Sequence, residues 1–200
     1  MTLKQTPSQT VGPFFAYGLT AQQYHYPLSQ LATGMMRPQS PIAGTPIRIS
    51  GQVFDGNAQP VDDAMIELWQ PNAAGRFNHP NDTREAYTLE PDFLGFGRCG
   101  TGTHPAHRFV FDTIKPGAIS AQQAPFITVV VFMRGLLNHA YTRLYFSDDT
   151  AAQDHDSVLQ GVPAERRHTL IAQRHESPAG IEYHFDIHMQ GPQETVFFDL

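Results

Sequence analysis

The most restrictive feature of this sequence is a nine-residue apolar run, residues 125–133, that ends abruptly at Arg134 and Gly135. Most of its side chains are β-branched or aromatic, which favours a strand, and the run is too short to cross a membrane as a helix. Because apolar and polar residues do not alternate along it, the run predicts a strand that is buried on both faces. Arg134 would then lie where buried structure meets a surface or a cleft.

The composition favours a single all-β domain. Two hundred residues are enough to bury a hydrophobic core. Sixteen Gly and sixteen Pro, with 11% aromatic residues, predict many turns and few long helices. The 13 Lys and Arg against 19 Asp and Glu give a net charge of −6 that is spread thinly, so nucleic acid is not an expected partner.

Cysteine content and the amino terminus both bear on the cellular compartment. A single cysteine, Cys99, excludes an internal disulfide framework and is expected to be a buried core residue. The first ten residues lack the apolar core that a secretory signal requires. We therefore expect a cytoplasmic protein without membrane contact.

Residues 1–45 are predicted to form an extended N-terminal arm. Prolines recur through this part of the chain, and no sustained period of two or 3.6 residues is present. Disordered tails are usually poor in aromatic residues, whereas this segment carries five, namely Phe14, Phe15, Tyr17, Tyr24 and Tyr26. The arm is therefore expected to lie across its own domain or across a neighbouring chain.

Residues 46–200 are predicted to form one β-sandwich domain. Alternating or densely apolar stretches mark seven strands, at residues 47–53, 64–70, 108–114, 125–133, 141–146, 170–175 and 181–189. The fourth and fifth of these, and the last two, are expected to form hairpins. Residues 77–105 predict a long irregular loop, and residues 164–168 predict one helical turn. The predicted fold is all-β, a β-sandwich with an extended N-terminal arm and long irregular loops.

Histidines near the carboxyl end raise a metal hypothesis. Glu182, His184, Asp186 and His188 share one face of the last predicted strand. His184 and His188 would lie about 13 Å apart along it, too far to bind one ion together, although His184 and Asp186 stay possible as a pair. A free-standing metalloenzyme that uses the His184 face is therefore one alternative, beside a polar face that is solvated or buried at a subunit contact.

Residues 49–77 carry a recognisable motif. This segment resembles the signature of the intradiol ring-cleavage dioxygenases, with matches at Gly51, Val53, Val61, Ile66, Glu67, Leu68, Gly75 and Phe77. Ala58 departs from the pattern, which prefers Gly or Ser there, so the turn at this position is expected to be built differently.

Three further segments narrow the resemblance. Residues 6–14, 113–117 and 190–199 are similar to the alpha subunits of those family members that act on protocatechuate. Together with the signature, these segments extend the resemblance over nearly the whole chain. It implies a hetero-oligomer with a related beta chain, in which O2 cleaves protocatechuate to 3-carboxy-cis,cis-muconate during aromatic hydrocarbon catabolism.

The same resemblance implies that this chain does not hold the metal. Catalytic chains of the family bind Fe(III) through two Tyr and a His-x-His pair on a strand. Alignment on Pro125 and on the 113–117 turn puts Ile127 and Val129 at the two His positions, Phe109 at one Tyr position and Glu85 near the other. The resemblance therefore assigns the iron to the partner beta chain and none to this chain.

The resemblance implies that this chain helps to bind the substrate, a small aromatic acid. It implies that Thr10, Gly12 and Pro13 lie beside the substrate ring and that Arg134 faces the substrate carboxylate. A guanidinium offers a planar fork of donors that matches a carboxylate. The competing interpretation of Arg134 is a charge at a strand end that pairs with a surface acid such as Asp148.

A third class of function is a non-catalytic β-sandwich interaction module with an adhesive arm. Only the enzyme-subunit hypothesis requires Arg134 and the segment from Thr10 to Pro13 to act together. No Ser-His-Asp spacing, phosphate-binding loop or paired-carboxylate motif favours a different chemistry.

Overall fold

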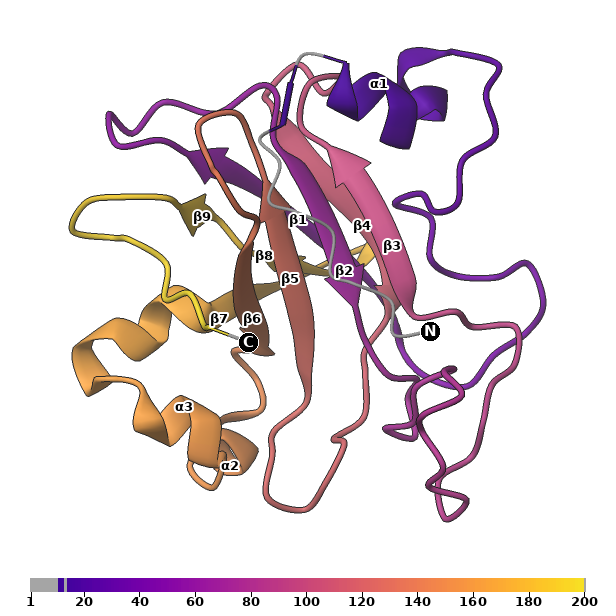
Figure 1. Cartoon of the computed structure of the whole chain (residues 1–200). Coiled ribbons are helices and arrows are strands. Elements are labelled where there is room, and N and C mark those ends of the chain that lie inside the picture. The colour runs from indigo at the N-terminus through magenta and orange to yellow at the C-terminus, as the bar shows by residue number, and fades with distance from the viewer. Residues whose placement is uncertain (1–10, 13, 200) are drawn as a thin grey trace, which may run out of the picture.

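Nine strands form one mixed sheet that folds over on itself into a sandwich, as seen in a computed structural model that describes residues 11–12 and 14–199 (Figure 1). The strand order is β3-β2-β5-β6-β7-β8-β1-β4, with β9 paired to β1. The strands are β1 (Pro46–Phe54), β2 (Met65–Trp69), β3 (Phe96–Gly100), β4 (Arg108–Ile114), β5 (Phe126–Phe132), β6 (Ala140–Phe146), β7 (Ile171–Ser177), β8 (Gly180–His184) and β9 (Ile187–His188).

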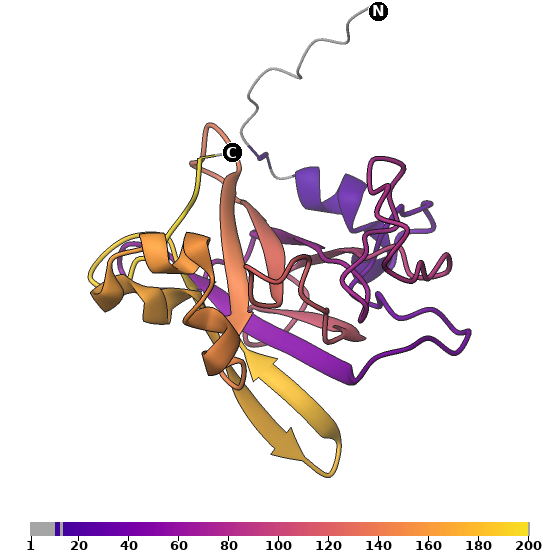
Figure 2. The ribbon, with the colours of Figure 1, turned by 90° about the horizontal axis from the view of Figure 1, so that it is seen from below.

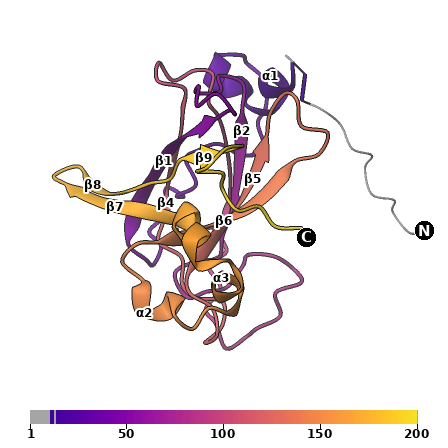
Figure 3. The ribbon, with the colours of Figure 1, turned by 90° about the vertical axis from the view of Figure 1, so that its left-hand side faces the viewer.

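Two layers enclose the main core. Strands β3, β2, β5 and β6 form one layer, and β4, β1 and β8 lie in the other. Strand β7 connects the layers, because its first residues pair in parallel with β6 while the rest pairs antiparallel with β8. The hairpin of β7 and β8 extends beyond the body of the sandwich in Figures 2 and 3.

Strand β5 is buried fully on one face only, so the prediction of a strand buried on both faces is wrong. Ile127, Val129 and Val131 point into the sandwich and are at most 1% exposed. Their neighbours Thr128 and Val130 face outward and are half-buried. A sandwich of two layers leaves the outer face of each layer to be covered by loops, and these cover β5 only in part.

The other predicted strands are confirmed, within one or two residues at most ends. Both predicted hairpins are present, β5 with β6 and β7 with β8. The last predicted strand is divided into β8 and β9 by Phe185 and Asp186, where the amide of Phe185 donates to the Ser50 carbonyl at 2.8 Å. A Cβ at Gly51 would collide with the Phe185 carbonyl, so this close approach of two strands requires glycine.

Strand β3 and most of the short helices were not predicted. Strand β3 lies inside the stretch expected to be irregular, where glycines at 95, 97 and 100 hide its pattern. The helices are α1 (Phe15–Leu19), η1 (Ala21–Tyr24), α2 (Thr150–Gln153), α3 (Ser157–Gly161) and η2 (Ala164–Leu170). Only η2 corresponds to a predicted helical turn. None of the described helices has the length and apolar character needed to cross a membrane.

The turn after β1 explains the unusual position of Ala58. Its φ angle is +57°, in the left-handed region where glycine is favoured over residues with a Cβ. Asp55 shapes this turn, because its Oδ1 accepts hydrogen bonds from the amides of Asn57 and Gln59 at 2.8 and 2.9 Å. The hydrogen bonds to Asp55 therefore hold the turn in place. Ala58 is strained there, because it adopts a positive φ angle.

The described part of the arm lies across its own domain and closes the gap between β3 and β4. The carbonyl of Thr33 accepts from the Arg98 amide on β3 at 3.2 Å, and the carbonyl of Gly34 accepts from the Asp112 amide on β4 at 2.8 Å. Gln23 adds side-chain hydrogen bonds to both the amide and the carbonyl of Gly100, at 2.7 and 3.1 Å. Backbone groups that would otherwise be exposed at two strand edges are thereby satisfied.

An ion-pair network joins the end of β4 to the turn after β6. Lys115 donates to the carboxylates of Asp148 and Asp149 at 3.0 and 2.8 Å, and the Tyr183 hydroxyl donates to Asp148 at 2.9 Å. Burial alone would lower the pKa of Lys115, but the hydrogen bonds to the two carboxylates outweigh it and raise the pKa above its usual value. The network therefore favours the charged lysine.

We predict that Lys115→Met lowers the free energy of unfolding by about 1–3 kcal/mol, because it leaves two partly buried carboxylates without their cation. Urea denaturation followed by circular dichroism measures the change. Arg48→Met is the matched control, because Arg48 is 52% exposed in its pair with Asp112 and should contribute less. Equal losses in the two variants would contradict a special role for the Lys115 network.

Candidate functional site

Arg134 lies in the turn after β5, at one end of the sandwich. Its side chain is 61% exposed, and its Nε donates a hydrogen bond to the Asp63 carboxylate. Strand pairing explains the contact, because Met65 of β2 is opposite Phe132 of β5 and Asp63 lies just before β2. The competing interpretation, a strand-end charge paired with a surface acid, thus describes the contact that is present, but the acid is Asp63, because Asp148 belongs to the Lys115 network.

Part of the Arg134 guanidinium stays available to a ligand. Among the described residues, no hydrogen bond to either of its Nη atoms is found. Those two nitrogens form the outer edge of the fork, the edge that binds a carboxylate through two parallel hydrogen bonds. Asp63 therefore holds the inner edge of the guanidinium and leaves the outer edge facing solvent.

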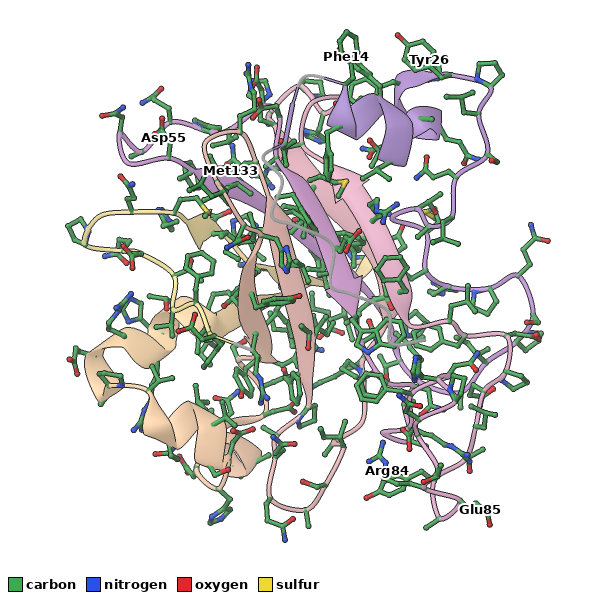
Figure 4. The ribbon with its side chains drawn as sticks, in the orientation of Figure 1. Phe14, Tyr26, Asp55, Arg84, Glu85 and Met133 are labelled. Carbon is green, nitrogen blue, oxygen red and sulfur yellow. The ribbon has the colours of Figure 1, made fainter. Side chains whose placement is uncertain are left out.

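The arm reaches the same end of the molecule. The Phe15 ring of α1 lies 5.8 Å from the Phe132 ring of β5, centroid to centroid. Gly12 precedes this contact, and its carbonyl accepts a hydrogen bond from the Phe15 amide at 3.0 Å. Figure 4 accordingly shows Phe14 and Met133 at one end of the molecule, with Arg84 and Glu85 at the other.

The structure thus brings two of the four predicted substrate-binding residues to one end of the sandwich. Gly12 is exposed, and a Cβ added to it would meet no atom within 4 Å. Thr10 and Pro13 lie outside the described residues.

Two residues at this end were missed by the sequence reasoning. The His139 ring lies 5.3 Å from the Phe132 ring, and its Nε2 is 2.7 Å from the Tyr141 hydroxyl. Tyr141 belongs to β6 and His139 directly precedes it, and the β5–β6 hairpin returns both to the end of β5. The His-x-Tyr spacing directly after the Arg134 turn is the signal that could have found them. Phe132, His139 and Tyr141 form an aromatic cluster at the end of β5 that precedes Arg134.

The face that includes His184 shows side chains that are already engaged. His184 Nε2 lies 3.0 Å from Asp186 Oδ2, and the other oxygen of that carboxylate accepts from the Gln52 amide. His188 stacks on Phe54 with a centroid distance of 4.8 Å. Within the described residues no group of three or more His, Cys, Asp or Glu side chains could hold a metal ion.

Comparison with known proteins gives a full-length match. The family described as "Dioxygenase" matches residues 21–191. The chain is 53% identical to a protocatechuate 3,4-dioxygenase alpha chain of Burkholderia cepacia, with 100% of this chain and 99% of the relative covered. The chain belongs to the intradiol dioxygenase family. The alpha chain of the Pseudomonas putida enzyme is 39% identical, with 99% and 98% covered.

More distant relatives agree with this placement. The beta chain of the Burkholderia cepacia enzyme is 35% identical over 162 residues, which cover 76% of this chain and 67% of that one. Among solved structures, the dioxygenase domain from Streptomyces sp. SirexAA-E superimposes with a TM-score of 0.61 at 22% identity, covering 96% and 100% of the two chains. The structural likeness shows that the sandwich is the intradiol dioxygenase fold.

The residues at the aligned metal positions do not fit Fe(III). Ile127, Val129 and Phe109 are apolar, and all three are at most 1% exposed inside the core. Glu85 is exposed on a loop at the end of the molecule opposite Met133 (Figure 4). Three of the four positions are therefore closed to solvent, and the fourth is exposed.

The two residues aligned with the His-x-His pair, Ile127 and Val129, both point to the inner face of β5, which is buried in the core. A shift of one residue moves every side chain of a strand to the opposite face. The outward face of β5 begins at Phe126 and Thr128, and it offers no imidazole either.

We predict that the purified chain alone, mixed with Fe(III), lacks the visible absorption band of a ferric-tyrosinate centre and retains no stoichiometric iron after gel filtration. Absorption spectroscopy and metal analysis provide the measurement, and the chain co-expressed with its proposed beta partner serves as the positive control. A coloured single chain with one iron per molecule would contradict the analysis of the aligned positions.

Proposed function

We propose that this chain is the alpha subunit of an enzyme that cleaves protocatechuate with O2 to 3-carboxy-cis,cis-muconate. Two alpha chains of protocatechuate 3,4-dioxygenases match it over their whole length, which supports the same role here. The enzyme would act in aromatic catabolism, and its expected location is the cytoplasm.

The proposed partner is a related beta chain that holds the iron. The similarity of this chain to a beta chain from Burkholderia cepacia supports a pair of subunits that share one fold. When bound by the partner, Fe(III) supplies the redox chemistry of ring cleavage. This chain contributes binding and orientation of the substrate, and it is not expected to be active alone.

Arg134 is the residue that carries the proposal. Its outer edge is free of hydrogen bonds from the described residues, it lies in the turn directly after β5, and Asp63 holds its Nε. A planar carboxylate bound there would accept two parallel hydrogen bonds.

The arm would complete the pocket beside the ring of the substrate. Gly12 lies at the same end of the sandwich as Arg134 and has open space around its Cα. A glycine next to a flat ring lets the backbone approach closely. Thr10 and Pro13 are proposed for the same surface on the strength of the resemblance of residues 6–14 to alpha chains.

We predict that Arg134→Ala in the assembled enzyme lowers kcat/KM for protocatechuate by about 10- to 100-fold, the equivalent of a charge-assisted hydrogen bond. Catechol lacks the carboxylate, so its kcat/KM should change little. Arg134→Lys keeps the charge without the planar fork and should give an intermediate loss for protocatechuate. Steady-state oxygen uptake with both substrates measures the effect.

Arg174→Ala is the matched control, because Arg174 lies on the β7–β8 hairpin and pairs with Glu176. Its kinetics should equal those of the unmodified enzyme. Equal losses for protocatechuate and catechol in Arg134→Ala would instead assign Arg134 to structure, as the interaction-module hypothesis predicts.

A further inference from the structure

The segment that leads into β2 is held by hydrogen bonds on both sides of Asp63. Thr101, which is 0% exposed, donates its hydroxyl to the Val61 carbonyl at 2.7 Å. The Thr101 amide donates to the Ala64 carbonyl at 2.9 Å, and the Thr101 hydroxyl oxygen accepts from the Ala64 amide at 3.2 Å. Because Thr101 directly follows β3, the end of one strand fixes the backbone of residues 61–64, which include Asp63.

The arm packs against the same segment. A Cβ at Gly102 would collide with both the Tyr24 hydroxyl and the Asp62 carbonyl, so the end of η1 and the segment before β2 meet over this glycine. Burial is the main cause of a raised pKa at the Tyr24 hydroxyl, and the nearby carboxylates of Asp62 and Asp63 add to it. The position of Asp63 is therefore set by β3 and by the arm, independently of Arg134.

The side chain of Arg134 is much less constrained. Arg134 is the second residue of a turn in which the Leu136 amide donates to the Met133 carbonyl at 3.3 Å, and Gly135 follows with a φ angle of +90°. A glycine with positive φ at the third position is typical of a type II turn. This turn fixes the backbone, but the Arg134 side chain is 61% exposed, and ordering its rotatable bonds costs conformational entropy.

We propose that Asp63 is a positioning residue for the substrate carboxylate, which acts through Arg134 and does not touch the substrate itself. Its hydrogen bond from Nε holds the plane of the guanidinium, so that both Nη atoms face the ligand together. A carboxylate that accepts two parallel hydrogen bonds requires this alignment. The arginine is thus partly ordered before the substrate arrives, which favours binding. This inference rests on the proposed function of Arg134.

Two effects of Asp63 on the substrate oppose each other. Its negative charge repels the substrate carboxylate, whereas its oxygen atom orients the guanidinium. Asp63→Asn removes the charge and keeps an oxygen that can accept from Nε, and Asp63→Ala removes both. Because both variants lack the charge, the difference between them measures the hydrogen bond alone.

The experiment is a calorimetric titration of the assembled enzyme without O2, so that the substrate binds and is not consumed. Asp63→Ala should bind protocatechuate about 2- to 12-fold more weakly than Asp63→Asn, the equivalent of ordering one long side chain. Catechol has no carboxylate and should bind equally to the two variants. With O2 present, the difference for protocatechuate should appear in KM, with kcat nearly unchanged.

A second readout separates positioning from a structural role. When each is combined with Arg134→Ala, Asp63→Ala and Asp63→Asn should give the same Kd for protocatechuate, because no guanidinium is left to orient. Asp112→Ala is the matched control, since it removes a carboxylate from the ion pair with Arg48 in the other layer of the sandwich. Its Kd for protocatechuate should equal that of the unmodified enzyme.

The possible failures are distinguishable. Equal Kd values of Asp63→Ala and Asp63→Asn for protocatechuate, with Arg134→Ala still selective for the substrate that carries the carboxylate, would overturn the positioning role and leave the proposed function intact. A difference between the two variants that persists beside Arg134→Ala, or that is as large for catechol, would also overturn it and assign Asp63 to the fold of the turn. Equal losses for both substrates in Arg134→Ala would overturn the proposed function itself.

Discussion

The antiparallel pairing of β2 with β5 is the constraint on which the functional surfaces of this chain depend. At one end of this ladder Met65 is opposite Phe132, and the pairing brings Asp63 to Arg134. At the other end Trp69 is opposite Thr128, and the indole lines a cavity together with Phe77. The two ends are separated by about 13 Å of strand, which keeps the two surfaces distinct.

The same ladder decides which side chains belong to the core. Side chains alternate between the two faces, so Ile127 and Val129 are committed to the interior once Val131 is. In this chain both positions are filled by apolar side chains of the core, at most 1% exposed. We therefore propose that a chain with this core contributes to the enzyme from the ends of β5 and leaves the iron to the beta chain.

The arm is the second structural requirement. Its residues 33–36 close the sandwich between β3 and β4, and Gln23 anchors the preceding turn on Gly100. This attachment holds α1 against Phe132 and so leads residues 11 and 12 past the end of β5. The role proposed for the arm in a neighbouring chain's pocket requires such an attachment, because an unanchored arm would lose much of its binding energy to ordering.

The sequence predicted the sandwich and most of its strands because period-two alternation is a local signal. The sequence did not predict β3, because its glycines provide no apolar alternation. It overestimated the burial of β5, because a strand face covered by a loop can be as apolar in sequence as one covered by a second sheet. The partner of Arg134 could not be predicted, because Asp63 reaches it only through the register of two strands.

The most direct test of the central claim is an experimental structure of the assembled enzyme with bound protocatechuate. We expect the Nη atoms of Arg134 to lie within hydrogen-bond distance of the substrate carboxylate, with Gly12 beside the ring and every protein ligand of the iron supplied by the beta chain. A substrate carboxylate in solvent, with Arg134 bound to Asp63 alone, or an iron ligand from this chain, would contradict the account.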